Sequence, residues 1–176
     1  NGSAFGSGAS VFTGVTNSGG TGTLAITTNN VISGPNSGTG LFTGISNSAA
    51  AATVNITGNV IRNHTIGGTT GTLTGISNSG AAATAINLNS NQLGNATGGL
   101  VTFSSATAAS GAVTGITNTA GAATCALSIQ TNDIRGIVYS VAAGASTHLY
   151  LNNTAATLSQ NISSNTFTNL NVNTTG

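Results

Sequence analysis

The chain has 176 residues, of which only Arg62, Asp133 and Arg135 are charged, and its formal net charge is +1. Two arginines cannot neutralise the phosphates of a nucleic acid, one cysteine forms no disulfide within the chain, and no apolar run approaches the roughly 18 residues of a membrane span. The positive mean hydropathy of +0.24, with so little net charge, is also unlike the usual composition of disordered chains.

Two short motifs alternate along the chain. The first reads Thr-Gly-Val/Ile-Thr/Ser-Asn and begins at Thr13, Thr43, Thr74 and Thr114. The second follows each copy of the first and consists of two aliphatic residues at period two, an Asn, any residue and an apolar residue, and it recurs around Asn165. In the fourth repeat, Asn132 lies 16 residues after Ile116. The same spacing counted back from Asn165 reaches Leu149, so the fifth copy of the first motif is placed at Thr147-His148-Leu149.

These motifs divide the chain into five repeats of similar length. In chain order, we predict a lead-in or partial rung over 1–10, a single repeat domain over 11–169 and a polar tail over 170–176. The repeats lie near 11–40, 41–70, 71–111, 112–145 and 146–169, with a loop inserted within 94–111.

The alternation of apolar residues within each repeat predicts strands. A repeat of about 30 residues with three short strands is one rung of a parallel β-helix, so the predicted fold is an all-β solenoid of about five rungs. Equivalent side chains of successive rungs then stack in columns. Three core columns are predicted: Val15, Ile45, Ile76, Ile116 and Leu149; Phe12, Phe42, Leu73 and Val113; and Val31, Ile61, Leu93, Ile134 and Phe167.

Two sets of asparagines recur at fixed phases of the repeat. One ends the first motif, and the other lies in the second motif; we name them the turn-one and turn-two sets. Stacked in register, their side-chain amides can bond to one another from rung to rung, although asparagines also occur simply as surface-turn residues. The turn-one set is Asn17, Asn47, Asn78 and Asn118, with Leu151 at the fifth place, and the turn-two set is Asn29, Asn59, Asn91, Asn132 and Asn165.

This pattern resembles the right-handed parallel β-helix repeats of long bacterial secreted and cell-surface proteins, the adhesin-like β-strand-repeat proteins. The resemblance covers about Val11 to Asn169. It implies a secreted or cell-surface protein that is not an enzyme. The right hand follows from the resemblance and from the usual crossover of parallel strands.

Residues suited to catalysis are scarce. Glycoside hydrolysis commonly uses two carboxylates, and the chain has one, Asp133. Arg62 and Arg135 occupy the same phase of the repeat two rungs apart, so they are either solvated surface arginines or a small cationic spot near Asp133. We therefore expect no enzymatic activity and no catalytic residue.

Metal and cofactor sites are not predicted either. His64 and His148 fall on different strands of different repeats, and no Cys, Asp or further His is spaced to complete a metal site. Cys125 falls in a column of mostly small residues, which fits a buried free cysteine.

The sequence leaves three functions open. The first is a structural or adhesive module of an extracellular fibre; because the chain begins at Asn1 without Met or a signal peptide and neither end resembles a cap, we expect a segment of a longer chain or a subunit that stacks end to end. The second is an ice-binding β-solenoid, for which Thr is abundant but fades from the outward positions of the second strands. The third is a carbohydrate-binding β-helix like a phage spike. Expected partners are further copies or further repeats, and surface glycans; neither a nucleic-acid partner nor a membrane span is expected.

Overall fold

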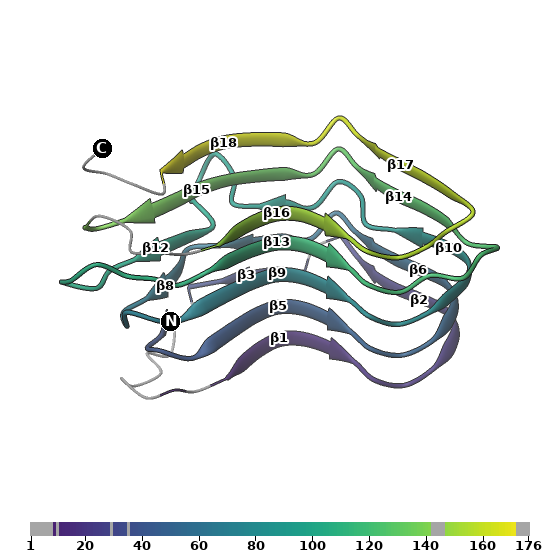
Figure 1. Ribbon diagram of the computed structural model, residues 1–176, viewed down its shortest axis with the longest axis horizontal. Helices are drawn as coiled ribbons and strands as arrows, with labels where there is room; N and C mark the ends of the chain where they lie inside the picture. The colour runs from purple at the N-terminus through teal and green to yellow at the C-terminus, as the bar shows by residue number, and fades with distance from the viewer. Residues whose placement is uncertain (1–8, 10, 29, 35, 142–146, 172–176) are drawn as a thin grey trace.

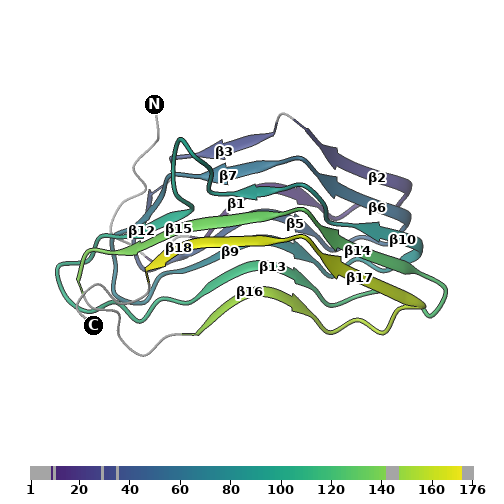
Figure 2. The same cartoon turned by 90° about the horizontal axis from the view of Figure 1, so that it is seen from above.

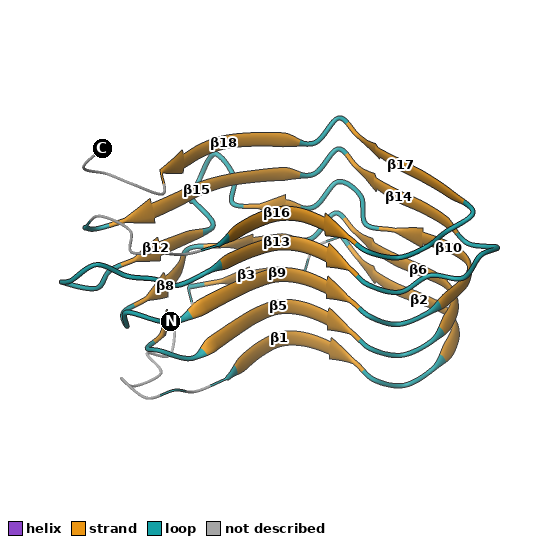
Figure 3. Ribbon diagram, in the orientation of Figure 1, coloured by secondary structure: helices purple, strands orange, loops and turns teal. Residues whose placement is uncertain are grey.

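The computed structural model describes residue 9 and residues 11–28, 30–34, 36–141 and 147–171. Throughout these residues the chain is built from strands and turns without a helix (Figure 3). It winds upward in rungs, and each rung places one strand on each of three sides (Figure 1). The predicted all-β parallel solenoid of about five rungs is confirmed.

Three parallel sheets form the sides of the solenoid. Sheet one contains β1 (Phe12–Asn17), β5 (Leu41–Asn47), β9 (Thr72–Asn78), β13 (Val113–Asn118) and β16 (His148–Asn153). Sheet two contains β2 (Thr21–Thr27), β6 (Ala51–Thr57), β10 (Ala82–Asn87), β14 (Ala126–Gln130) and β17 (Ser159–Ser163), which succeed one another at one end of the molecule in Figure 2.

Sheet three is less regular than the other two. It contains β3 (Val31–Ser33), β7 (Val60–Arg62), β11 (Gln92–Leu93), β15 (Asp133–Tyr139) and β18 (Thr166–Asn171). In the first three rungs this side continues as β4 (Asn36–Ser37), β8 (His64–Ile66) and β12 (Val101–Phe103). Strand β12 lies inside the segment expected as an inserted loop and pairs with both β8 and β15.

The core lies between the three sheets and consists of stacked aliphatic columns. Val15, Ile45, Ile76 and Ile116 pair in sequence across sheet one, and the last three of them are fully buried. Equivalent apolar residues therefore bury one another, and each rung covers the rung below it.

The glycine of the first motif makes room for the core residue of sheet three. A Cβ added to it would lie within 3 Å of that residue's Cδ1, which is closer than real Cβ atoms approach. Sheets one and three therefore interlock at this column. The pairs, with the Cβ to Cδ1 distance, are Gly14 with Ile32 (2.7 Å), Gly44 with Ile61 (2.5 Å), Gly75 with Leu93 (2.9 Å) and Gly115 with Ile134 (2.9 Å).

The first rung differs from the prediction by one residue. Ile32, not Val31, pairs with Ile61 and continues the core column, whereas Val31 is 55% exposed. The doublet Asn29-Asn30 left two registers open, and a slip of one residue exchanges the two faces of a strand.

The fifth rung differs from the prediction by two residues. Leu151, not Leu149, pairs with Ile116; Leu149 pairs with Thr114 and is 44% exposed. His148 pairs with Val113 and so occupies the apolar column of Phe12 and Phe42 rather than the glycine place. The prediction was wrong because it used the spacing of the fourth rung, and the turn between sheets one and two varies in length.

A left-handed residue precedes the described turn-two asparagines of rungs two to five. The φ angles are +68° at Gly58, +58° at Ser90, +55° at Thr131 and +56° at Ser164. The asparagines themselves are not left-handed, so their recurrence is not explained by tolerance of that backbone geometry. Their side chains must supply the reason.

Candidate functional site

The turn-one asparagines form a continuous ladder of side-chain hydrogen bonds. Each Nδ2 donates to the Oδ1 of the asparagine one rung higher, at 2.7 to 2.8 Å. The fifth member is Asn153, which pairs with Asn118, so Leu151 does not interrupt the ladder. The turn-one ladder is Asn17, Asn47, Asn78, Asn118 and Asn153.

The turn-two asparagines form a second ladder in the same direction. Asn29 lies outside the described residues, and Asn30 is the member that donates to Asn59, at 3.0 Å. From there each Nδ2 again donates to the next Oδ1, at 2.9 to 3.1 Å. The described turn-two ladder is Asn30, Asn59, Asn91, Asn132 and Asn165.

The backbone fixes the direction of the turn-two ladder. The Nδ2 of Asn91 donates to the carbonyl of Ile56 in the rung below at 2.9 Å, and its Oδ1 accepts from the backbone N–H of Asn59 at 3.1 Å. If the Asn91 amide were flipped, its oxygen would face the carbonyl oxygen of Ile56 and its NH2 group would face the backbone N–H of Asn59. Asn132 repeats this arrangement. Each interior amide therefore joins three rungs.

Burial makes these bonds energetically important. Asn47, Asn59, Asn78 and Asn91 are completely buried. A buried amide without partners costs several kcal/mol, so each ladder position selects for Asn strongly. Both ladders are thus structural elements of the solenoid interior.

The two ladders end differently at the last rung. The Nδ2 of Asn153 donates to the Oε1 of Gln160 at 3.2 Å, and the Nε2 of Gln160 donates to the carbonyl of Ala155 at 3.3 Å. Gln160 occupies the place of the buried Leu127 one rung lower. It therefore closes the turn-one ladder, which explains why the apolar alternation is lost in the fifth repeat.

No such closure exists for the turn-two ladder among the described residues. Asn165 accepts from Asn132 and donates to the carbonyl of Ile129. In the lower rungs, the backbone N–H of the turn-two asparagine donates to the Oδ1 of the asparagine one rung higher, as it does in Asn59, Asn91 and Asn132. The backbone N–H of Asn165 occupies the equivalent position in the last rung. At the opposite end, the Oδ1 of Asn30 occupies the accepting position.

The three charged side chains are engaged locally. The Nε of Arg135 donates to Asp133 at 2.9 Å and the two form an ion pair, which raises the pKa of the arginine. Arg62 donates to Asn95 and Thr97 of the segment that precedes β12. Arg135 is therefore held by Asp133 beside it, and Arg62 is hydrogen-bonded to the segment before β12.

Both histidines belong to aromatic clusters that join residues of sheets one and three. His64 is buried and stacks on Phe42 with ring centroids 3.9 Å apart. The Nε2 of His148 lies 3.3 Å from the hydroxyl of Tyr139, which donates to the carbonyl of Gly111 at 2.8 Å. Burial lowers the pKa of His148.

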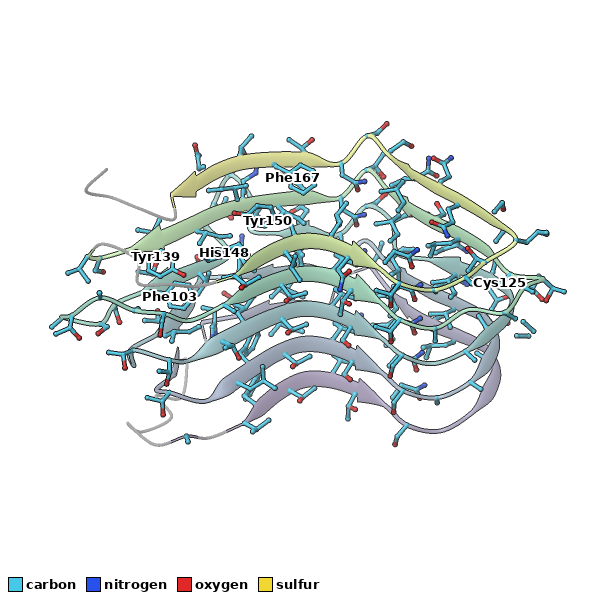
Figure 4. All side chains as sticks on the ribbon, in the orientation of Figure 1. Phe103, Cys125, Tyr139, His148, Tyr150 and Phe167 are labelled. Atoms are coloured by element: carbon cyan, nitrogen blue, oxygen red, sulfur yellow. The ribbon has the colours of Figure 1, made fainter. Side chains whose placement is uncertain are left out.

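Tyr150 stands at the place of the motif glycine in the fifth rung. Its ring lies 5.9 Å from that of Phe167, the residue of sheet three that stacks on Ile134 (Figure 4). Partial burial raises the pKa of Tyr150. This pair replaces the close glycine contact of the lower rungs, so the last rung has its own packing.

Cys125 lies in the turn before β14 and is fully buried. Burial raises the pKa of its thiol, which opposes formation of the reactive thiolate. Among the described residues no three His, Cys, Asp or Glu side chains gather as a metal site would require. Nor does the described part of the chain hold a helix that could cross a membrane.

The outward positions carry hydroxyls and amides. Sheet one carries two hydroxyl columns over four rungs, and Thr43 of the first column is buried. The fifth places of the two columns are Leu149 and Asn152. On sheet two, Asn87 donates to Asn55 at 2.8 Å. The hydroxyl columns are Thr13, Thr43, Thr74 and Thr114, and Thr16, Ser46, Ser77 and Thr117.

Comparison with known proteins identified no relative of the chain. No protein-family model matches the chain, and no similar protein was found among curated sequences or solved structures. The function has to be argued from the geometry of the chain itself.

Three polar residues at the ends of the ladders were not predicted from the sequence to take part in them: Asn30, Asn153 and Gln160. A signal for Asn153 was available, because Asn165 follows Leu151 by the same 14 residues that separate Val15 from Asn29 and Ile45 from Asn59. Asn30 had no such signal, since the spacing favoured its neighbour. Gln160 is understood only once its partner Asn153 is known.

Proposed function

We propose that the chain is a non-enzymatic structural module of a secreted, cell-surface fibre, resembling adhesin-like repeat proteins. The observation that carries the proposal is the pair of asparagine ladders. In these ladders, the most deeply buried side-chain amides of the described solenoid hydrogen-bond from one rung to the next. The few charged side chains are also bound to neighbouring residues, as in the ion pair of Arg135 with Asp133. Such a rod supplies length and stiffness and leaves its faces for contact.

The outer faces fit a surface role. They present neutral hydroxyl and amide groups, which bond to glycan hydroxyls and to like surfaces without charge repulsion. Surface glycans and further copies or repeats of the solenoid are the proposed partners. Catalysis finds no support, because the one carboxylate, Asp133, is held by Arg135.

Immunogold labelling of the source cells with antibodies raised against the folded chain tests the location. We expect label on the outer surface and on extracellular fibres. Label confined to the cell interior, or turnover of polysaccharide by the purified chain, would contradict the proposal. Adhesion of chain-coated beads to glycan arrays then identifies the contacted surface.

Ice binding is the second candidate, favoured by one observation. One hydroxyl column of sheet one is exposed or half-buried over four rungs and repeats at the rung spacing of about 4.8 Å; its members are Thr16, Ser46, Ser77 and Thr117. Thermal hysteresis measured on the wild type and on Thr16→Lys tests this function, with Thr23→Lys on sheet two as the control. Absence of hysteresis in the wild type removes the candidate.

Carbohydrate binding on an aromatic platform has little support. Phe42, Phe103 and Tyr139 are buried, and Phe103 stacks on Tyr139 inside the core with ring centroids 4.3 Å apart. Glycan contacts would therefore rest on the hydroxyl and amide groups of the outer faces.

A further inference from the structure

The two ends of the described solenoid are complementary. Both ladders run in one direction, because the Nδ2 of each ladder asparagine below the last rung donates to the asparagine one rung higher. The last rung therefore presents the backbone N–H and the amide of Asn165 as donors. The first rung presents the Oδ1 of Asn30 as an acceptor. The donor end of one copy can therefore pair with the acceptor end of a second copy, whereas two donor ends or two acceptor ends cannot pair.

The apolar columns continue across the same junction. Ile162 and Phe167 of the last rung are 47% and 42% exposed, whereas their column neighbours Ile129 and Ile134 are fully buried. A further rung would bury the two exposed side chains as Ile129 and Ile134 are buried. The first rung supplies suitable neighbours, since Ile26 and Ile32 stand in these two columns.

We propose that the last rung of one copy pairs with the first rung of a second copy, head to tail, through the turn-two ladder. Asn165 of the lower copy donates to Asn30 of the upper copy, and Phe167 and Ile162 pack beneath Ile32 and Ile26. This contact is heterologous, so it repeats at each new end and builds an open filament. Joining two last rungs would oppose donors to donors and is disfavoured.

Gln160 limits this association. It captures the amide of Asn153, so only the turn-two ladder crosses the junction, and it puts a polar side chain in the column of Leu127. Gln160→Leu completes that column and leaves the Nδ2 of Asn153 directed toward the next copy's Asn17. Burial of one leucine predicts association at least tenfold tighter, as an order of magnitude.

Two blocked variants test the direction of stacking. Ile162→Lys places a charge on the last rung, and Asn30→Lys replaces the acceptor of the first rung. Asn161→Lys is the control, because Asn161 is exposed and lies on the outward face of sheet two between Gln160 and Ile162. Circular dichroism melts establish that each variant folds, and sedimentation velocity measures the species formed.

Head-to-tail stacking predicts a specific pattern. The wild type and Asn161→Lys form a concentration-dependent series of multimers, and each blocked variant alone stays a monomer. An equal mixture of the two blocked variants forms dimers and nothing larger, because only one competent pair of ends remains. If Asn30→Lys dimerises alone, if Ile162→Lys dimerises alone, or if the wild type and the mixture stay monomeric, the inference is overturned.

This inference rests on the proposed structural function, but the two fail in different experiments. A surface location with monomeric chains overturns the stacking alone. An interior location overturns the proposed function, whatever the chains do in solution.

Discussion

The side-chain amide of Asn91 donates to the carbonyl of Ile56 in the rung below, at 2.9 Å, while also donating to Asn132 in the rung above. We expect Asn91→Ala to lower the free energy of unfolding by about 3 kcal/mol or more, because it leaves buried groups of both neighbouring rungs without partners. Urea unfolding measures the change. The exposed Asn161→Ala is the matched control and should stay within about 0.5 kcal/mol of the wild type; equal effects would show that the ladder contributes nothing special.

Gly75→Ala tests the interlocking of sheets one and three. Its new methyl group would lie 2.9 Å from Leu93 Cδ1 and 2.6 Å from the carbonyl oxygen of Gly115. Because one of these neighbours is backbone, we expect a loss of about 1–3 kcal/mol. Gly19→Ala is the control, since nothing lies within 4 Å of its added Cβ, and it should be neutral or slightly stabilising. A stable Gly75→Ala variant would contradict the tight packing.

Thr131→Gly should stabilise the protein. Thr131 is a β-branched residue held at a φ of +55°, a conformation that costs such a residue about 1–3 kcal/mol. Glycine removes that cost but adds freedom to the unfolded chain and loses the contact of the Thr131 hydroxyl with Ser90, so a net gain of about 1 kcal/mol is expected. Thermal melts measure it, and Thr117→Gly, on a regular strand, should instead melt lower.

Stability should fall at mildly acidic pH through His148. Burial lowers the pKa of His148 below its ordinary value of 6.5, so the unfolded chain binds this proton more readily than the folded chain. The stabilisation is therefore present above pH 6.5 and is lost as the pH falls through 6.5 toward the lowered pKa. Urea unfolding at pH 7.5 and 5.5 should show a smaller loss in His148→Leu, in which leucine fits the apolar column. His64 is present in both proteins, so its contribution cancels, and an unchanged loss would refute the assignment.

Periodicity in the sequence is enough to predict the solenoid, because stacked rungs must repeat their core residues at fixed phases. The columns through Ile45, Ile76 and Ile116 follow directly from it. Registers at the ends are harder to predict, since the end rungs depart from the repeat. The choice between Val31 and Ile32 depends on the register of an asparagine doublet, and the choice between Leu149 and Leu151 depends on a turn of variable length.

The ladders were predictable as recurring asparagines, but their direction was not. That direction comes from backbone groups such as the carbonyl of Ile56 and the N–H of Asn59, whose orientation depends on the left-handed residue before the turn-two asparagines of rungs two to five. A one-letter sequence carries no trace of which way an amide points. The closure of one ladder by Gln160 is hidden for the same reason.

The neutrality of the ladders has a consequence for the environments that the rod tolerates. Salt screens interactions between charges, and the described residues contain a single ion pair, Arg135 with Asp133. The contacts that join one rung to the next are amide bonds and aliphatic packing, neither of which relies on formal charge. The cohesion of this solenoid should therefore change little between fresh water and brine.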